Sequence, residues 1–188
     1  MEPAVATLRS HPERAVPERA AEILAAGQVA HVGFIEEGRP VVIPFGYHFD
    51  AEFPESLYLH GATAGRAIQR LESGEPVCVA VTLLDGLVYS KTALYHSMNY
   101  RSAVCFGRGR RVTDPSVQQR IYERMVSRYF AGRTAGRDYS IPTAAHLEAT
   151  GLIEIRIEEW NAKMREGGPK GPTDADTDAP GTCGVVAV

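Results

Sequence analysis

The segment with the clearest chemical potential is a ten-residue stretch in which an apolar strand leads into a glycine-flanked, basic turn. Residues 58–67 read Tyr-Leu-His-Gly-Ala-Thr-Ala-Gly-Arg-Ala, so His60 ends the strand and Arg66 lies in the first turn of a helix. Free N–H groups at a helix start, the positive end of the helix dipole and a guanidinium together suit a phosphate. The same pattern is typical of a plain turn with a solvated arginine, and alone it does not separate the two interpretations.

A second polar stretch leads into a buried strand. Residues 97–107 read Ser-Met-Asn-Tyr-Arg-Ser-Ala-Val-Cys-Phe-Gly, so Tyr100, Arg101 and Ser102 could face a pocket or simply begin the strand. Trp160, the only tryptophan, follows the last apolar strand. At that position it could fill the core or form one wall of a site for a planar ligand.

Other catalytic patterns are weak or missing. His31, His48 and His96 lie in or beside strands, but none is paired with another ligand at metal-binding spacing. A G-x-S-x-G elbow for a serine nucleophile is not found. Gly107-Arg-Gly109 lies inside a strand, which disfavours a Rossmann dinucleotide site.

Many short strands and a few helices must position these side chains. Apolar alternation predicts strands over residues 30–35, 39–49, 56–60, 76–84, 102–113 and 152–157, and helices over 17–27, 64–73 and from 115 onward. Asp85-Gly86 is predicted to turn the chain into residues 87–93. The second strand has one small face formed by Val42, Pro44, Gly46 and His48. We therefore expect a mainly β fold, a closed six-stranded antiparallel barrel with helices packed outside it.

Composition limits the class of protein. The length of 188 residues suits one domain. We expect an N-terminal arm over residues 1–15 and an extended or mobile tail, rich in Gly, Pro and Asp, over residues 166–188. A net charge of −3 gives no support for a nucleic-acid or membrane partner. Three well-separated cysteines, no signal-peptide core and no long apolar run predict a reduced, cytoplasmic protein.

Five blocks occur in the order found in one known family. They are Val41–Tyr47, Leu57–Arg66, Pro76–Gly86, His96–Ser102 and Val104–Gly107. Together they resemble the split-barrel FMN-binding family related to pyridoxamine 5′-phosphate oxidase, in particular the flavin-nucleotide-binding branch that includes nitroimidazole-resistance reductases. The resemblance covers residues 16–165 and implies a split-barrel homodimer with two FMN sites at its interface.

The resemblance also assigns roles to individual residues. It implies that the backbone of Val42, Ile43 and Pro44 borders the isoalloxazine ring. It implies that His60, Gly61, Arg66 and Ala67 surround the ribityl phosphate, and that Tyr100, Arg101 and Ser102 of the partner subunit close the site near Trp160. His60 matches the active-site histidine of the nitroimidazole reductases, which makes it the candidate for substrate contact or proton delivery.

The resemblance implies an FMN-dependent oxidoreductase that reduces a small aromatic or nitro compound with a nicotinamide or deazaflavin donor. Ala67 stands where the oxidases carry a second basic phosphate ligand, and residues 160–165 match their substrate motif only in part. Pyridoxamine phosphate is therefore disfavoured as a substrate. Three alternatives stay open: a haem-binding or haem-degrading barrel with His60, His48 or His96 on the iron, a non-catalytic flavin-binding module, and a variant that uses the deazaflavin F420.

Overall fold

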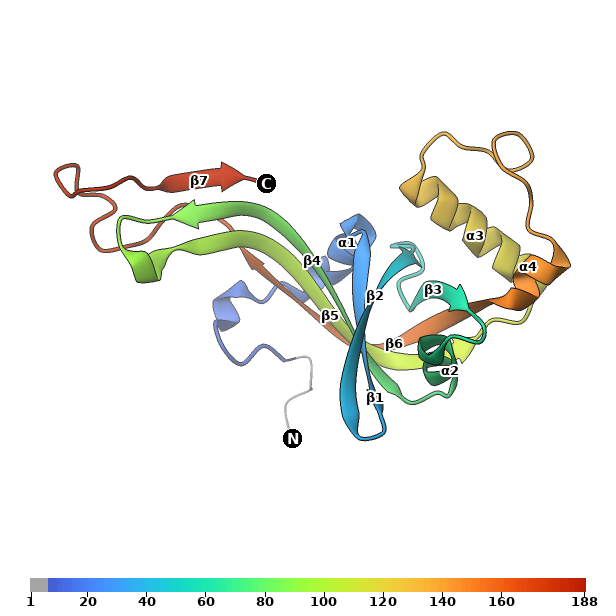
Figure 1. Cartoon of the computed structure of the whole chain (residues 1–188). Coiled ribbons are helices and arrows are strands. Elements are labelled where there is room, and N and C mark those ends of the chain that lie inside the picture. Colours follow the sequence, from blue (N-terminus) through green and yellow to red (C-terminus); the bar gives the residue numbers. More distant parts are fainter. Residues whose placement is uncertain (1–6) are drawn as a thin grey trace.

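A computed structural model describes residues 7–188 of the chain (Figure 1). The strands are β1 Val29–Glu36, β2 Arg39–Phe49, β3 Ser56–Ala62, β4 Pro76–Tyr89, β5 Ser97–Arg111, β6 Thr150–Arg165 and β7 Gly184–Ala187. The α-helices are α1 Ala20–Ala26, α2 Arg66–Glu72, α3 Pro115–Tyr129 and α4 Ala144–Ala149, and short 3₁₀ turns are η1 Pro12–Arg14, η2 Pro17–Arg19 and η3 Ala93–Tyr95. Of the predicted N-terminal arm over residues 1–15, residues 1–6 lie outside the described part.

The first six strands form a closed antiparallel ring in the order β1-β2-β3-β6-β5-β4, and β4 pairs again with β1. The closing contact aligns Ala30 of β1 with Val81 of β4. Closure leaves no open edge around the ring, which removes the main route by which a strand would pair with another chain. The prediction of a mainly β, six-stranded antiparallel barrel is confirmed. β7 is an additional strand that pairs with the distal part of β4.

The β1–β2 hairpin determines which residues of β2 lie on its outer face. Glu37 and Gly38 connect the strands with φ of 48° and 76°, the left-handed backbone that a tight two-residue hairpin turn requires. This register places Val42 opposite Gly33 and Pro44 opposite His31. The even-numbered residues of β2 therefore share the outer face, as the alternation predicted.

The core lies inside the barrel and against α1. Ile23 and Leu24 of α1 are fully buried with inward-facing strand residues such as Tyr47, Leu57 and Leu59. The Tyr47 hydroxyl donates a hydrogen bond of 2.5 Å to the Leu24 carbonyl. Burial of this apolar surface is the main stabilising contribution, and the hydrogen bond satisfies the one polar atom that Tyr47 carries into the core.

The predicted turn at Asp85-Gly86 is wrong. β4 continues through these residues to Tyr89, and the pairing with β5 shifts register between Leu84 and Gly86, as in a β-bulge. The Asp85 carboxylate is bound by Arg101 of β5, so a potential turn residue is held inside the ladder instead. As a result β4 and β5 project beyond the barrel as a long arm, with β7 beside β4 (Figure 1). β6 likewise runs past its predicted end, so Trp160 lies within a strand.

The C-terminal tail is tied to the tip of this arm. The carboxylate of Asp174 accepts hydrogen bonds of 2.8 Å from the Ser90 hydroxyl and the Lys91 N–H, and it also accepts from the N–H of Gly171. From there the chain returns along β4 as β7. The tail therefore has a defined position against the β4–β5 connection.

Helix α3 lies outside the barrel, on the side away from the arm (Figure 1). It begins at Pro115 after Asp114, whose carboxylate accepts from the N–H groups of Ser116 and Val117. Ile121 and Met125 pack on Leu152 of β6. Within residues 7–188, none of the helices combines the length and the apolar character needed to span a bilayer.

Candidate functional site

An apolar groove with a volume of about 350 Å³ lies between the barrel and the C-terminal half of α3. Its lining consists of Gly46, His60, Tyr122, Met125, Val126, Tyr129 and Phe130. A glycine on β2 leaves the floor without a side chain, and β3 supplies the single imidazole. Mostly apolar walls with a few placed polar groups are the usual make-up of a ligand site.

His60 combines contact with the groove and access to solvent. Its ring meets the Tyr122 ring nearly edge-on, with centroids 5.7 Å apart and planes at 80°. Desolvation by the surrounding side chains lowers the pKa of the His60 imidazole, although one side of the residue stays exposed. A histidine that is neutral at physiological pH can ligate a metal ion or exchange a proton with a substrate.

The C-terminal end of α3 is clamped to the barrel, which holds the wall of the groove in place. The Tyr129 hydroxyl accepts a 2.8 Å hydrogen bond from the Tyr47 N–H and lies 2.7 Å from the Gln28 carbonyl, to which it donates. The Arg128 guanidinium donates to the carbonyls of Leu24 and Gly27 and lies 4.8 Å from the centre of the Tyr47 ring. Two consecutive α3 residues thus connect the groove to the α1–β1 junction.

One lining residue of the groove, Gly46, belongs to the outer face of β2, which continues along the β1–β2 hairpin. Val42 is 63% exposed and Pro44 is also exposed, and both share their face with Gly46. Ile43 points the other way and packs against the core. Small residues continue this face across the ring, since Gly33 pairs with Val42 and Cys78 pairs with Gly33.

The other predicted phosphate ligands, Gly61, Arg66 and Ala67, follow His60 at the C-terminal end of β3 and the start of α2. Arg66 begins α2 after Gly65, and its Nε forms an ion pair of 3.1 Å with Glu36. The N-cap residue of α2 is Gly65, which has no side chain to accept a hydrogen bond from the first N–H groups of the helix. Ala67 packs against the core and Gly61 lies against Ile68. The Glu36 contact was not anticipated from the sequence.

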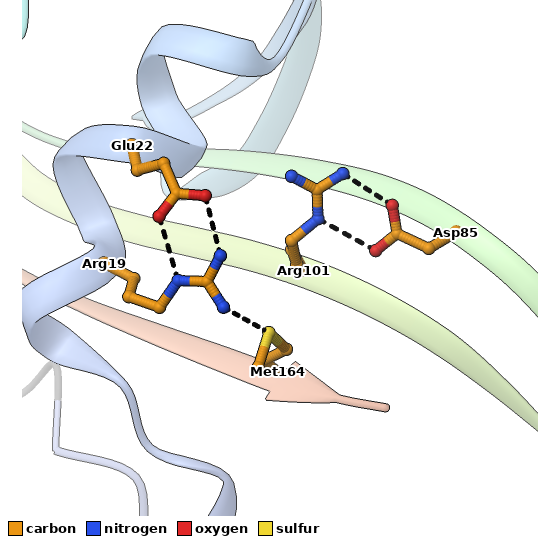
Figure 2. Close-up of polar contacts among 5 residues, drawn as sticks. All are labelled: Arg19, Glu22, Asp85, Arg101 and Met164. Carbon is orange, nitrogen blue, oxygen red and sulfur yellow. Dashed lines mark hydrogen bonds and ion pairs between the residues drawn. The ribbon is translucent and has the colours of Figure 1, made fainter. Parts of the chain in front are cut away.

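The predicted residues of β5 lie on the arm side of the barrel. The Arg101 guanidinium donates two hydrogen bonds to Asp85, at 2.9 Å and 2.6 Å, next to a second pair formed by Arg19 and Glu22 (Figure 2). The hydrogen bond from Arg101 lowers the pKa of Asp85. The Arg19 guanidinium also donates to the Met164 sulfur, 2.9 Å away. Arg19, Asp85, Arg101 and Met164 border a cavity of about 380 Å³.

Alternation puts Tyr100 and Ser102 on the face of β5 opposite to Arg101. The Ser102 hydroxyl donates a 3.3 Å hydrogen bond to the Lys163 carbonyl. Trp160 pairs with Cys105 and packs against the barrel core, where it also borders a small cavity with Pro54.

Comparison with known proteins then identifies the family. The family model for pyridoxamine 5′-phosphate oxidase matches residues 17–164. The chain belongs to the pyridoxamine 5′-phosphate oxidase family. A comparison with curated proteins finds no match.

Solved structures of this family agree over most of the chain. The flavocytochrome Anf3 from Azotobacter vinelandii is 29% identical, with a TM-score of 0.84 over 98% of this chain and 85% of that one. An FAD- and haem-binding protein from Mycobacterium smegmatis is 30% identical, with a TM-score of 0.81 over 93% and 84% of the two chains. A candidate 5-nitroimidazole antibiotic resistance protein from Bacteroides thetaiotaomicron is 22% identical, with a TM-score of 0.64 over 79% and 85%, and shows the fold alone. The predicted family and split-barrel fold are confirmed.

Within this family fold, one chain brings together only part of the predicted site. His60, Val42 and Pro44 lie along one continuous surface around Gly46. Tyr100 and Ser102 share the outer face but belong to β5, which is separated from β2 by β1 and β4. At about 4.8 Å per strand, three steps amount to roughly 14 Å. Sequence reasoning missed Tyr122, Tyr129 and Phe130, for which the apolar spacing of α3 was the only available signal.

The described part of this family member contains no cluster of three or more His, Cys, Asp or Glu side chains that could hold a metal ion. That finding concerns ions held by several side chains. A haem iron is held mainly by its porphyrin, so one histidine in an apolar groove can be its protein ligand.

Proposed function

We propose that this protein binds flavin and haem and acts in electron transfer or reduction. The observation that carries the proposal is the apolar groove with His60 in its wall, which shares Gly46 with the face that carries Val42 and Pro44. It is supported by similarity over nearly the whole chain to a flavocytochrome and to an FAD- and haem-binding protein.

The residues of the groove fit a haem. A lowered pKa keeps His60 neutral, which is the form that ligates iron. The side chains of Met125, Val126 and Phe130 offer the apolar surface that a porphyrin buries. Bound haem would supply one-electron and oxygen chemistry, while Tyr122 would orient the His60 ring and the apolar walls would exclude water.

The hairpin face fits a flavin ring. Val42 and Pro44 are exposed on one face of β2, and Pro44 carries no N–H that a ladder would have to satisfy. Arg66 and the uncapped start of α2 would hold the phosphate, and to do so Arg66 would exchange its contact with Glu36. Tighter binding of FMN or of FAD in a titration would identify the flavin.

We further propose that two copies of the chain complete the flavin site. Tyr100 and Ser102 lie roughly three strand spacings from Val42 in one chain, so a second copy is the simplest way to bring them to the ring. The reduction of a small aromatic or nitro compound by a nicotinamide or deazaflavin donor would take place on the same flavin face.

Titration of the purified protein with haemin, FMN and FAD tests the proposal. The protein should shift the Soret band of haemin and quench flavin fluorescence. His60→Ala should abolish the Soret shift and leave flavin quenching intact, whereas His96→Ala, an exposed histidine on the arm, should change neither. Val42→Glu should weaken flavin binding, while Leu94→Glu at the arm tip should not. If haem binding survives His60→Ala and is lost in His48→Gln, the iron ligand is His48 and the assignment to His60 is wrong. Failure to bind either cofactor would refute the proposal.

A further inference from the structure

A second cavity, with a volume of about 440 Å³, lies on the other side of α3 from the His60 groove. It is lined by His48, Asp50, Phe53, Glu55, Ser56, Tyr58, Arg120, Ile121, Arg124 and Glu154. The two cavities share no lining residue. Nothing in the proposed flavin and haem sites uses this second cavity.

His48 forms part of its wall, and its side chain has no hydrogen bond with any of the residues that the structure describes. The residue is only 8% exposed, and its Nδ1 is sealed from solvent without a partner among residues 7–188. The imidazole ring lies beside the ring of Tyr58, with ring centroids 6.3 Å apart. Desolvation, and after it the charge of Arg124, lowers the pKa of His48, so the ring is neutral and carries one N–H donor. Because Nδ1 is sealed from solvent, a ligand in the cavity can meet only the Nε2 side of the ring, which also has no hydrogen bond with any of residues 7–188.

Two of the carboxylates that line the cavity are already paired. Glu154 accepts hydrogen bonds from the Ser56 hydroxyl at 2.7 Å and from the Tyr58 hydroxyl at 3.5 Å, and it forms an ion pair with Arg110. Asp50 is paired with Arg124. Because these charges are compensated inside the protein, they do not repel an anion as bare carboxylates would.

Arg120 provides the positive charge. Its guanidinium lines the cavity from α3 and has no hydrogen bond or ion pair with any residue that the structure describes. Glu55, the remaining carboxylate, is exposed. Beside these charges the walls are apolar and aromatic, since Phe53 is 60% exposed and Tyr58 and Ile121 are partly or fully buried.

We propose that this cavity binds a small organic anion, a carboxylate carried on a flat ring. The carboxylate would accept hydrogen bonds from Arg120 and from the imidazole N–H of His48, and the ring would lie against Phe53 and Tyr58. The donating nitrogen of His48 would be Nε2, the ring nitrogen that is not sealed from solvent. The site is independent of the flavin and haem proposal, because it uses none of the same residues.

Calorimetric titration of the full-length protein with benzoate tests the inference, with benzamide as the neutral ligand of the same shape. Benzoate should bind with a Kd of about 1 mM or below, and benzamide about tenfold more weakly, as expected when a charge-assisted hydrogen bond is lost. Arg120→Gln should weaken benzoate binding about tenfold. Arg39→Gln, which removes an exposed arginine outside the cavity, should leave benzoate binding unchanged.

His48→Phe should also weaken benzoate binding. In case this variant does not fold, the unmodified protein provides a second measurement: the imidazole nitrogen resonances of His48 should shift when benzoate is added. His60→Ala should leave benzoate binding intact, and Arg120→Gln should leave flavin and haem binding intact, so the two proposals fail separately. Absence of saturable benzoate binding, equal binding of benzamide, or unchanged binding in Arg120→Gln would each refute the proposed anion site.

Discussion

Replacing Tyr129 by Phe should loosen α3 from the barrel at a cost that can be worked out from three contacts. The hydroxyl accepts from the Tyr47 N–H at 2.8 Å and lies 2.7 Å and 3.0 Å from the carbonyls of Gln28 and Tyr47. It has one proton, so it donates to one carbonyl at a time. The variant removes one accepted and one donated hydrogen bond and leaves backbone groups with poorer partners, which costs about 1–3 kcal/mol of unfolding free energy.

For a chain of this length each kcal/mol corresponds to about 2–4 °C, so the melting temperature should fall by roughly 2–12 °C. Urea unfolding followed by circular dichroism measures the loss directly, and the slope with denaturant should not change. Tyr95→Phe is the matched control, because Tyr95 is 47% exposed and its hydroxyl has no hydrogen-bond partner among residues 7–188. If the two variants have the same midpoint, the hydroxyl does not anchor α3 and the argument for a fixed groove wall is wrong.

Three further predictions concern packing and protonation. Gly109→Ala would place a Cβ 2.2 Å from the Leu71 carbonyl oxygen and should lower the free energy of unfolding, measured by thermal unfolding, by about 1–3 kcal/mol or more. In the control Gly46→Ala the new Cβ has its nearest neighbour at 3.6 Å, so the free energy of unfolding should change by less than about 0.5 kcal/mol. Equal losses in the two variants would contradict the packing argument. Although partial desolvation of Asp174 acts in the opposite direction, hydrogen bonds from Lys91, Ser90 and Gly171 lower the pKa of its carboxyl. The contact between the tail and the arm is therefore complete above the ordinary value of 3.8 and is lost as the pH falls through the lowered value. Hydrogen exchange of β7 should accelerate in that acidic range, and Asp174→Asn should show the acceleration already at neutral pH. The His60 ring should titrate below its ordinary value of 6.5 in an NMR pH series, because desolvation disfavours the charged form, and a midpoint at or above 6.5 would contradict the apolar groove.

The fold could be predicted to a large extent, because alternating side chains determine strand faces locally. Val42, Pro44 and Gly46 were predicted on one face and the structure places them there. The predicted turn at Asp85-Gly86 is wrong because of a contact that is distant in the sequence. An Asp-Gly dipeptide can form a turn or a bulge, and the pairing of Asp85 with Arg101, 16 residues later, favours the bulge. No local pattern contains that information.

The candidate site could be predicted only where it is local. His60 at the end of β3 was identified from its own segment, but Tyr122 and Tyr129 reach it from a helix whose position depends on tertiary packing. The ion pair between Arg66 and Glu36 shows the same limit, since it joins residues 30 positions apart that only the folded hairpin brings together.

The most direct test of the central claim is the absorption spectrum of the purified protein, combined with the mass of the small molecules that it releases. After reconstitution with flavin and haemin, the protein should show flavin bands and a Soret band, and the His60→Ala variant should keep the flavin bands and lose the Soret band. A protein that stays colourless and releases neither flavin nor haem, or a Soret band unchanged in the variant, would contradict the account.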